Sequence, residues 1–153
     1  MTNLQQIADR LAIEARLIRY VSANDADDWE GMVECFAEDA SWGDGPPETR
    51  ETLLERFSTM RTRSSTIMPI DRVRTAQHLI SNVEIHLDGD VATSTCAATA
   101  YLVGPRGDEE ILLVRGIVYT DRLVRTERGW LIQNRRHQLK WMYEGDLVAG
   151  SAP

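Results

Sequence analysis

Apolar side chains recur at helical spacing along the first part of the chain. They are separated by steps of three, four or seven residues, and they are Leu4, Ile7, Leu11, Ile18 and Val21. Such spacing places side chains on one face of a helix. The pattern predicts a helix over about residues 4–22 that buries this face.

Two further helices are predicted before the middle of the chain. The stretch "DDWE", which starts at Asp27, has the form of a capping box with Asp27 as the cap. The helix that follows should end near Ala40 and should bury Trp29, Met32, Val33, Phe36 and Ala37. Residues 46–60 predict the third helix, with proline at its start and an apolar face made of Leu53, Leu54 and Phe57.

The second half of the chain has the composition of a β-sheet. Segments rich in β-branched and aromatic residues cover 74–87, 90–103, 110–126 and 129–143. The stretches "DGD", "GPRGD" and "TERG" separate them and are typical of hairpin turns. Three helices followed by an antiparallel meander predict one α+β domain over residues 1–143, with the helices covering one face of a strongly curved sheet. Residues 144–153 are expected to form a tail.

The second predicted strand contains a run of small side chains, "STCAATA" at residues 94–100. Small residues on the concave face of the sheet would leave room for a ligand. The same composition allows a helix to pack closely on the sheet. Composition alone favours this second interpretation.

Charge and hydropathy restrict the class of protein. The chain has 153 residues and a net charge of -7, and no basic cluster is long enough to indicate nucleic-acid binding. No apolar run approaches membrane-spanning length, and the N-terminus lacks the pattern of a signal peptide. Cys35 and Cys96 lie in apolar segments without C-x-x-C spacing, which is typical of core residues in a reducing compartment. We therefore expect a soluble, cytoplasmic protein.

Metal and nucleophile chemistry find little support among the motifs. His78, His86 and His137 lack pairwise ligand spacing, and the aspartates close to His86 belong to a predicted hairpin turn. The stretch "NDADDWEG" lacks the ligand pattern of a calcium loop. There is no G-x-S-x-G and no phosphate-binding glycine loop. We expect neither a metal nor a cofactor, which leaves acid–base catalysis.

Three residues are candidates for acid–base chemistry, and each has a simpler interpretation. Asp25 is a carboxylate that the predicted helix cap does not need, but it is also typical of a solvated loop. His78 opens the first long strand, where a lone histidine is more often structural than catalytic. Tyr20 is most simply a helix-end residue with its ring inside and its hydroxyl outside.

The order of these residues along the chain resembles a known family. The stretches "IRYVSANDADDWEGMVECFAEDASW", "TAQHLISNVEIHLDGDVATS" and "GIVYTDRLVRTERGWLIQNRR" resemble the SnoaL-like group of the nuclear-transport-factor-2-like superfamily, over about residues 4–141. The branch most similar in appearance includes scytalone dehydratase, bile-acid 7α-dehydratase and hexachlorocyclohexane dehydrochlorinase. The resemblance implies a cone of three helices and a curved sheet around a pocket, with additional short strands.

The resemblance also implies site residues. In these enzymes an aspartate before the second helix pairs with a histidine that enters the sheet, and Asp25 and His78 match those positions. Tyr20 matches a tyrosine that contributes to catalysis in the dehydratases. By this resemblance His78 would take a proton from a carbon next to an activating group, and Asp25 would hold its ring.

Two departures from the family pattern concern the identity of the substrate. The second catalytic histidine of scytalone dehydratase aligns with Tyr101. The arginine that other members use on the last strand aligns with Leu139 or Lys140. We predict substrate contacts from Tyr101, Trp42 and Thr120.

The resemblance implies a cofactor-independent lyase that acts on a small hydrophobic cyclic or polycyclic substrate. Two alternatives stay open on the same fold. One is a ketosteroid-isomerase-like isomerase or a polyketide cyclase with Asp25 as base. The other is a binding or assembly subunit, such as the β subunit of a ring-hydroxylating dioxygenase. A homo-oligomer, dimer or trimer, is the family-based expectation, whereas a β subunit would need an iron-binding α partner.

Overall fold

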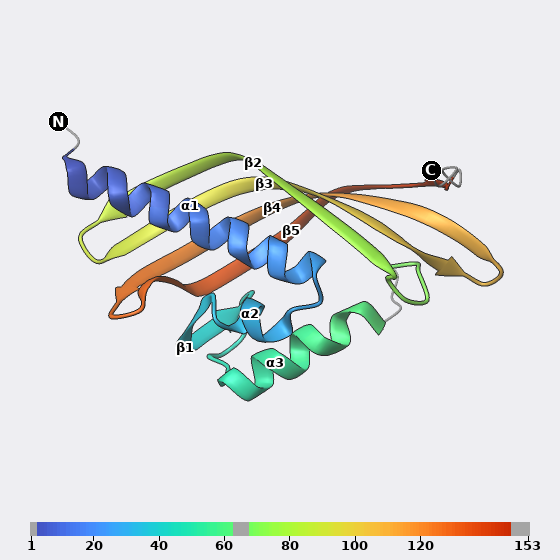
Figure 1. The fold of residues 1–153 in the computed structure, drawn as a ribbon, viewed down its shortest axis with the longest axis horizontal. Coiled ribbons are helices and arrows are strands. Elements are labelled where there is room, and N and C mark those ends of the chain that lie inside the picture. Colours follow the sequence, from blue (N-terminus) through green and yellow to red (C-terminus); the bar gives the residue numbers. More distant parts are fainter. Residues whose placement is uncertain (1–2, 63–67, 148–153) are drawn as a thin grey trace.

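The computed structural model describes residues 3–62 and 68–147 of the chain. The elements follow in the order α1 (Leu4–Asp25), α2 (Trp29–Val33), β1 (Phe36–Trp42), α3 (Arg50–Thr59), the 3-10 helix η1 (Met60–Thr62), β2 (Thr75–Asp88), β3 (Val91–Arg106), β4 (Glu109–Thr126) and β5 (Gly129–Asp146). Figure 1 shows α1 lying along the long strands, with α2 and α3 beside it.

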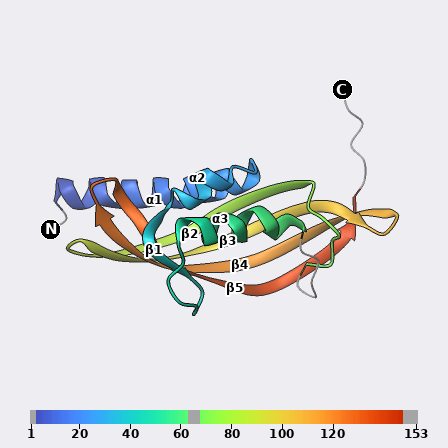
Figure 2. The same ribbon diagram turned by 90° about the horizontal axis from the view of Figure 1, so that it is seen from below.

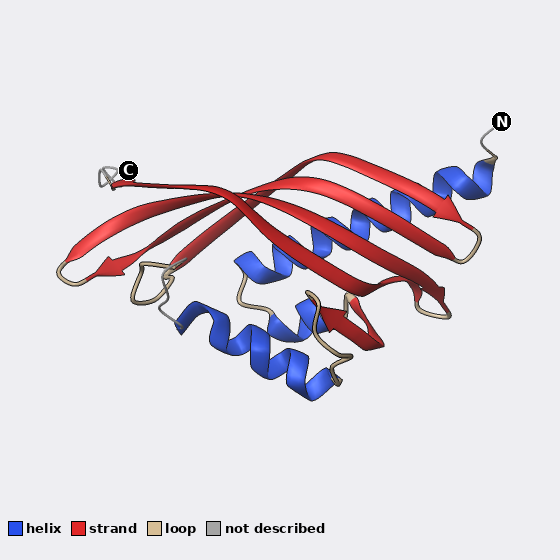
Figure 3. Ribbon diagram, turned by 180° about the vertical axis from the view of Figure 1, so that it is seen from behind, coloured by secondary structure: helices blue, strands red, loops and turns tan. Residues whose placement is uncertain are grey.

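The five strands form one sheet in the order β1-β5-β4-β3-β2. The long strands pair antiparallel, whereas β1 runs parallel to β5. The sheet is twisted and curved, and the helices lie on one of its faces (Figures 2 and 3). The predicted α+β fold, with helices on one face of a curved and mainly antiparallel sheet, is confirmed.

The long strands and their turns are also confirmed. Gly89 and Gly107 lie in the first two turns and Gly129 opens β5 directly after the third, with φ of 60°, 60° and 86°. A hairpin of this kind needs a left-handed residue at its turn, and glycine adopts that conformation without a steric penalty. The last strand continues past the expected boundary at Tyr143 to Asp146. The tail over residues 148–153 lies outside the described residues.

Helix α1 forms as predicted, but it buries a different face. Among the apolar residues that predicted the helix, Val21 is buried, whereas the exposed ones are Leu4, Ile7, Leu11 and Ile18. The face that packs on the sheet carries Ile13, Leu17 and Tyr20 instead. Both sets have helical spacing, so the pattern alone supported two faces, and the predicted one was wrong.

A carboxylate marks the face that α1 turns toward the sheet. Asp9 accepts two hydrogen bonds of 2.7 Å from Arg125 of β4 and one of 3.1 Å from the indole nitrogen of Trp130 of β5. The Arg125 donors, more than any other contact, hold the pKa of the Asp9 carboxyl well below its usual range. Asp9 lies one helical turn before Ile13. The hydrogen bonds of Asp9 and the burial of Ile13 therefore turn the same face of α1 toward the sheet.

Helix α2 begins later and ends earlier than predicted. Its N-cap is Asp28, whose carboxylate accepts a hydrogen bond of 2.9 Å from the backbone N–H of Gly31. Asp27, the predicted cap, has a left-handed backbone with φ of 56° and pairs with Arg61 at 2.6 Å. The prediction of Asp27 was therefore wrong by one residue. The helix ends at Val33 because the chain then turns into strand β1.

Strand β1 replaces the second half of the predicted helix. Phe36 pairs with Ile132 of β5, and the carbonyl of Cys35 accepts a hydrogen bond of 2.9 Å from the N–H of Ile132. This strand exists only through pairing with a distant part of the chain, which no local pattern reveals. Helix α3 also starts later than predicted, with Thr49 rather than proline at its N-terminus.

The small side chains of β3 pack in the core. Cys96, Ala98 and Ala100 are buried together with Leu113 and Ile117 of β4. Within the described residues, this cluster contains none that belongs to a helix, so it supports neither the close packing of a helix nor an open space for a ligand at "STCAATA".

Loss of the Asp9 contact should destabilise the fold. We expect Asp9→Asn to lower the midpoint of urea unfolding at neutral pH clearly more than Asp90→Asn. Asp90 binds the same Arg125 at 2.8 Å, but its side chain is 81% exposed and screened by water. The folded pKa of Asp9 lies below the unfolded value of about 3.9, so its stabilisation is complete above that value and decreases below it.

The difference between wild type and Asp9→Asn should therefore shrink as the pH falls from about 4 to about 2. Equal destabilisation by the two variants, or a difference that does not depend on pH, would show that the Asp9 contact does not fix α1.

Candidate active site

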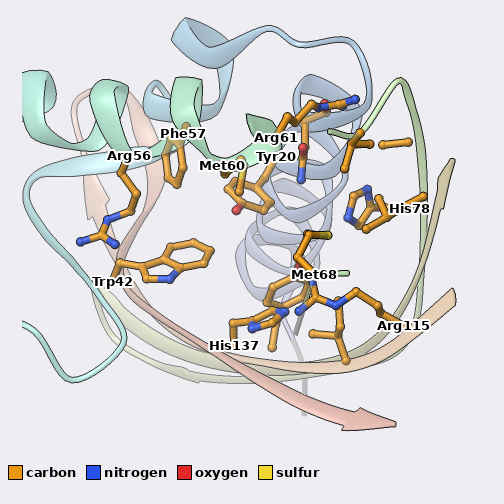
Figure 4. Close-up of a pocket in the computed structure, with 16 residues that line it drawn as sticks. Tyr20, Trp42, Arg56, Phe57, Met60, Arg61, Met68, His78, Arg115 and His137 are labelled. Carbon is orange, nitrogen blue, oxygen red and sulfur yellow. The ribbon is translucent and has the colours of Figure 1, made fainter. Parts of the chain in front are cut away.

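A pocket of about 260 Å³ lies between the helices and the sheet. Its residues come from α1, β1, α3, η1, the segment before β2 and the four long strands, and they are Tyr20, Asn24, Trp42, Arg56, Phe57, Met60, Arg61, Met68, Val73, Ala76, His78, Leu102, Arg115, Ile117, Tyr119 and His137. Figure 4 shows the labelled side chains around one common space. The lining is mostly apolar and aromatic, as in sites for small organic molecules.

Asp25 and His78 meet at the edge of this pocket. Asp25 is the last residue of α1 rather than part of a loop. One of its oxygens accepts a hydrogen bond of 2.8 Å from the backbone N–H of His78, and the other lies 2.6 Å from Nδ1 of the His78 ring. An ionised carboxylate only accepts hydrogen bonds, so the contact assigns the proton to Nδ1. In this tautomer of the neutral ring, Nε2 carries no proton and can accept one.

A bulge in β2 interrupts the alternation of its inward and outward side chains. The register with β3 shifts between Ser81 and Glu84, and Asn82 has φ of 51°. Ala76 and His78 before the bulge face the pocket, whereas the buried residue after it is Ile85. A bulge of this kind moves the inward positions from even to odd numbers.

Arg61 holds the chain beyond α1 close to the Asp25 carboxylate. Its guanidinium donates to the backbone carbonyl of Asn24 and pairs with Asp27 at 2.6 Å. The same side chain stacks over Trp29 at 5.5 Å from the ring centroid. The end of α1 is thus positioned by contacts to η1 and α2 as well as by His78.

Tyr20 is completely buried, with no outward hydroxyl of the kind that the sequence suggested. Its ring lies within about 6 Å of the rings of Trp42, Phe57 and Tyr119. Burial raises the pKa of Tyr20 well above 10, so its hydroxyl keeps its proton and can donate a hydrogen bond. The correction follows from the length of α1, which continues past Tyr20 to Asp25.

A buried ion pair lies behind the tyrosines. The guanidinium of Arg135 on β5 donates two hydrogen bonds of 2.7 Å to Asp121 of β4. Its carbon also lies 4.2 Å and 4.5 Å from the ring centroids of Tyr20 and Tyr119. Burial raises the pKa of Tyr119 to about 12, so this phenol also stays neutral.

Sequence reasoning missed several polar residues of the lining, and two of them lie on the sheet. Arg115 projects from β4 and His137 from β5, and Figure 4 shows both at the sheet side of the pocket. Burial, and next the charge of Arg115, lower the pKa of His137 from 6.5 to about 4. The sequence did contain a signal for Arg115. It lies two residues from both Leu113 and Ile117, so it shares the face of β4 that these buried apolar residues occupy.

The structure places two predicted substrate contacts outside this pocket. Leu102 and Tyr119 point into the pocket, so the strand neighbours Tyr101 and Thr120 lie on the other face of the sheet, where both are exposed. Predicting them as substrate-binding residues overlooked this alternation. Trp42, the third predicted contact, does line the pocket.

The described part of the chain, residues 3–62 and 68–147, contains no group of three or more His, Cys, Asp or Glu side chains arranged to hold a metal ion. Within the same ranges, no helix combines the length and the apolar character needed to cross a membrane.

The chain belongs to the SnoaL-like domain family, whose model matches residues 5–136. An uncharacterized protein of Mycobacterium tuberculosis is 28% identical in an alignment over 143 residues that covers 88% of this chain and 88% of that protein. The structure of another Mycobacterium tuberculosis protein of unknown function has 29% identity and a TM-score of 0.70 over 89% of this chain and 74% of that chain.

The fold is that of the nuclear-transport-factor-2-like superfamily. The structure of a hexachlorocyclohexane dehydrochlorinase superposes with a TM-score of 0.77 at 15% identity, over 99% of each chain. At this level of identity the likeness shows the cone-shaped fold alone.

The low pKa of His137 predicts a stability that depends on pH. Between about pH 6.5 and pH 4 the unfolded chain binds a proton at His137 that the folded chain does not bind. Stability should therefore fall as the pH is lowered through this window, by up to about 1.4 kcal/mol per pH unit. His137→Gln should remove this part of the slope, measured by urea unfolding at several pH values.

The matched control is His86→Gln, at an exposed position of β2, which should keep the wild-type slope. A wild-type slope in His137→Gln would contradict the buried, neutral state of His137.

Proposed function

We propose that the protein is a cofactor-independent acid–base enzyme, a lyase that eliminates water or another small leaving group from a small cyclic substrate. The observation that carries the proposal is the contact between Asp25 and His78. The carboxylate accepts both N–H groups of the histidine, at 2.8 Å from the backbone and 2.6 Å from the ring. The side chain of His78 is only 7% exposed and lines a mostly apolar pocket.

The first step is the removal of a proton from carbon. Nε2 of His78 takes a proton from the carbon next to a carbonyl group, and the electron pair moves to the carbonyl oxygen as an enolate. Asp25 stabilises the imidazolium through its contact with Nδ1. General-base catalysis of this kind contributes about 10² to 10⁴ in rate.

The second step is the departure of the leaving group. The enolate oxygen returns its electron pair, a carbon–carbon double bond forms, and the bond to a hydroxyl on the next carbon breaks. The imidazolium gives its proton to the departing hydroxide, which leaves as water. One substrate thus gives one unsaturated product and one water, and His78 returns to its starting state.

Tyr20 is the residue that we assign to the enolate oxygen. Its hydroxyl stays protonated because of burial, and it belongs to the pocket lining opposite the sheet. A hydrogen-bond donor held in a low-dielectric site stabilises a developing negative charge more than water does.

The size of the pocket supports a small substrate. A cavity of about 150 Å³ holds benzene, so about 260 Å³ suits one or two rings rather than a large polycyclic molecule. The fold shared with a hexachlorocyclohexane dehydrochlorinase supports an elimination, because loss of hydrogen chloride also removes a proton and a neighbouring group. The support is by analogy of fold.

The position of Asp25 favours the histidine as base over the aspartate. Both carboxylate oxygens already accept hydrogen bonds from His78, and Asp25 is not among the residues that line the pocket. An isomerase or cyclase that uses Asp25 alone would need this carboxylate to reach the substrate.

Proton abstraction can be measured before the natural substrate is known. Small cyclic ketones with a hydroxyl group one carbon beyond the acidic carbon are incubated with the protein in D₂O. Wild type should introduce deuterium next to the carbonyl and release the unsaturated ketone. His78→Gln should reduce both signals by at least about 10², and Asp25→Asn should also reduce them strongly because the ring loses its orienting carboxylate.

The matched controls are His86→Gln and Glu30→Gln, at exposed positions of β2 and α2, which should keep wild-type rates. Wild-type rates in both His78→Gln and Asp25→Asn would refute the proposal. Loss in Asp25→Asn with retained activity in His78→Gln would identify Asp25 as the base and favour the isomerase or cyclase.

A further inference from the structure

Arg115 is a buried guanidinium for which the described part of the chain provides no partner. The residue is 7% exposed, and its Nε atom is buried without any hydrogen-bond partner. Among residues 3–62 and 68–147, no carboxylate forms an ion pair with Arg115 and no acceptor receives a hydrogen bond from it. Figure 4 shows its side chain extending into the pocket toward His137 and Met68.

The other arginines of this region are neutralised. Arg135, behind the tyrosines, donates two hydrogen bonds to Asp121. Of the two arginines that share the pocket lining with Arg115, Arg61 pairs with Asp27 at 2.6 Å and Arg56 pairs with Glu48 at 2.9 Å. The lack of a carboxylate beside Arg115 is thus a local feature of this pocket.

The surroundings of Arg115 provide no compensation for its charge. Among the described residues, the pocket lining contains no aspartate or glutamate, and its apolar part includes Leu102 and Ile117. His137 has a pKa of about 4, so at neutral pH this neighbour is uncharged. Burial also lowers the pKa of Arg115, although a guanidinium keeps its proton in any protein environment. A buried charge without a partner is strongly unfavourable for the folded state.

We propose that Arg115 is an anion subsite and that it binds the carboxylate of a small cyclic substrate. The planar guanidinium presents parallel N–H donors that match the two oxygens of a carboxylate. One unpaired positive charge in a pocket without acids matches a ligand with one negative charge. The folded chain holds this guanidinium in place for a ligand, since Arg115 is buried and belongs to the pocket lining.

The identification of this ligand as the substrate rests on the proposed function. His78 and Arg115 project into the same space from β2 and β4, with β3 between them. A ring bound with its carboxylate at Arg115 would therefore present another part of the ring to His78. Arg115 fixes the orientation of the substrate in this arrangement, and His78 takes the proton.

Calorimetric titration with matched pairs of ligands tests the subsite. The probes are benzoate with benzamide, cyclohexanecarboxylate with cyclohexanecarboxamide, and 2-naphthoate with 2-naphthamide. Wild type should bind at least one carboxylate roughly 10- to 100-fold more tightly than its neutral amide, as expected for hydrogen bonds from a charged donor. Arg115→Met should abolish this preference, and Arg122→Met, an exposed arginine on the same strand, should retain it.

Thermal unfolding gives a second readout that needs no ligand. Arg115→Met replaces an unpaired buried charge with an apolar chain of similar length, so the ligand-free variant should unfold at the same temperature as wild type or higher. An unfolding temperature clearly below that of wild type would identify Arg115 as a structural residue and overturn the proposal. The absence of any carboxylate preference in wild type, or its persistence in Arg115→Met, would also overturn it.

Failure of the subsite and failure of the proposed function are distinguishable. Asp25→Asn and His78→Gln should both keep the carboxylate preference, because neither residue holds the anion. If wild type prefers carboxylates over amides but never exchanges carbon-bound protons, the proposed enzyme activity is wrong and the anion subsite stands. If wild type exchanges protons of neutral ketones but shows no preference for carboxylates, the anion subsite is wrong and the proposed enzyme activity stands.

Discussion

The contact between Asp25 and His78 is the constraint on which the site depends. It joins the last residue of α1 to the beginning of β2, 53 positions later in the chain. Because one oxygen binds the backbone and the other binds the ring, a single carboxylate positions the strand and orients the imidazole. Asp9 fixes the other end of α1 to β4 and β5. Tyr20 lies between these two carboxylates and is held over the pocket as a consequence.

Two buried arginines near the pocket, Arg135 and Arg115, differ in whether a carboxylate neutralises them. The pair of Arg135 and Asp121 is internally neutral and lies against the faces of two tyrosines, so it belongs to the packed core. Arg115 has the same charge and a similar burial but no carboxylate among the described residues. Such a group opposes folding without a ligand, and residues that break local rules in this way are characteristic of functional sites.

Elements with a pattern in their own stretch of sequence could be predicted, whereas elements that depend on pairing with a distant stretch could not. The four long strands and their turn glycines have such signals, whereas β1 depends on pairing with Ile132 far along the chain. The contact of Asp25 with His78 followed from family resemblance, because no local pattern distinguishes this aspartate from one in a loop. The bulge at Asn82 concealed which residues of β2 face inward, and alternation along β4 contained an unused signal for Arg115.

Chemical rescue shows whether His78 is the base. In His78→Gly the pocket gains room for a free imidazole molecule at the position of the lost ring. This variant should exchange no carbon-bound protons in D₂O on its own, and added imidazole should restore exchange in proportion to its concentration. Wild-type exchange by folded His78→Gly without imidazole would show that His78 is not the base.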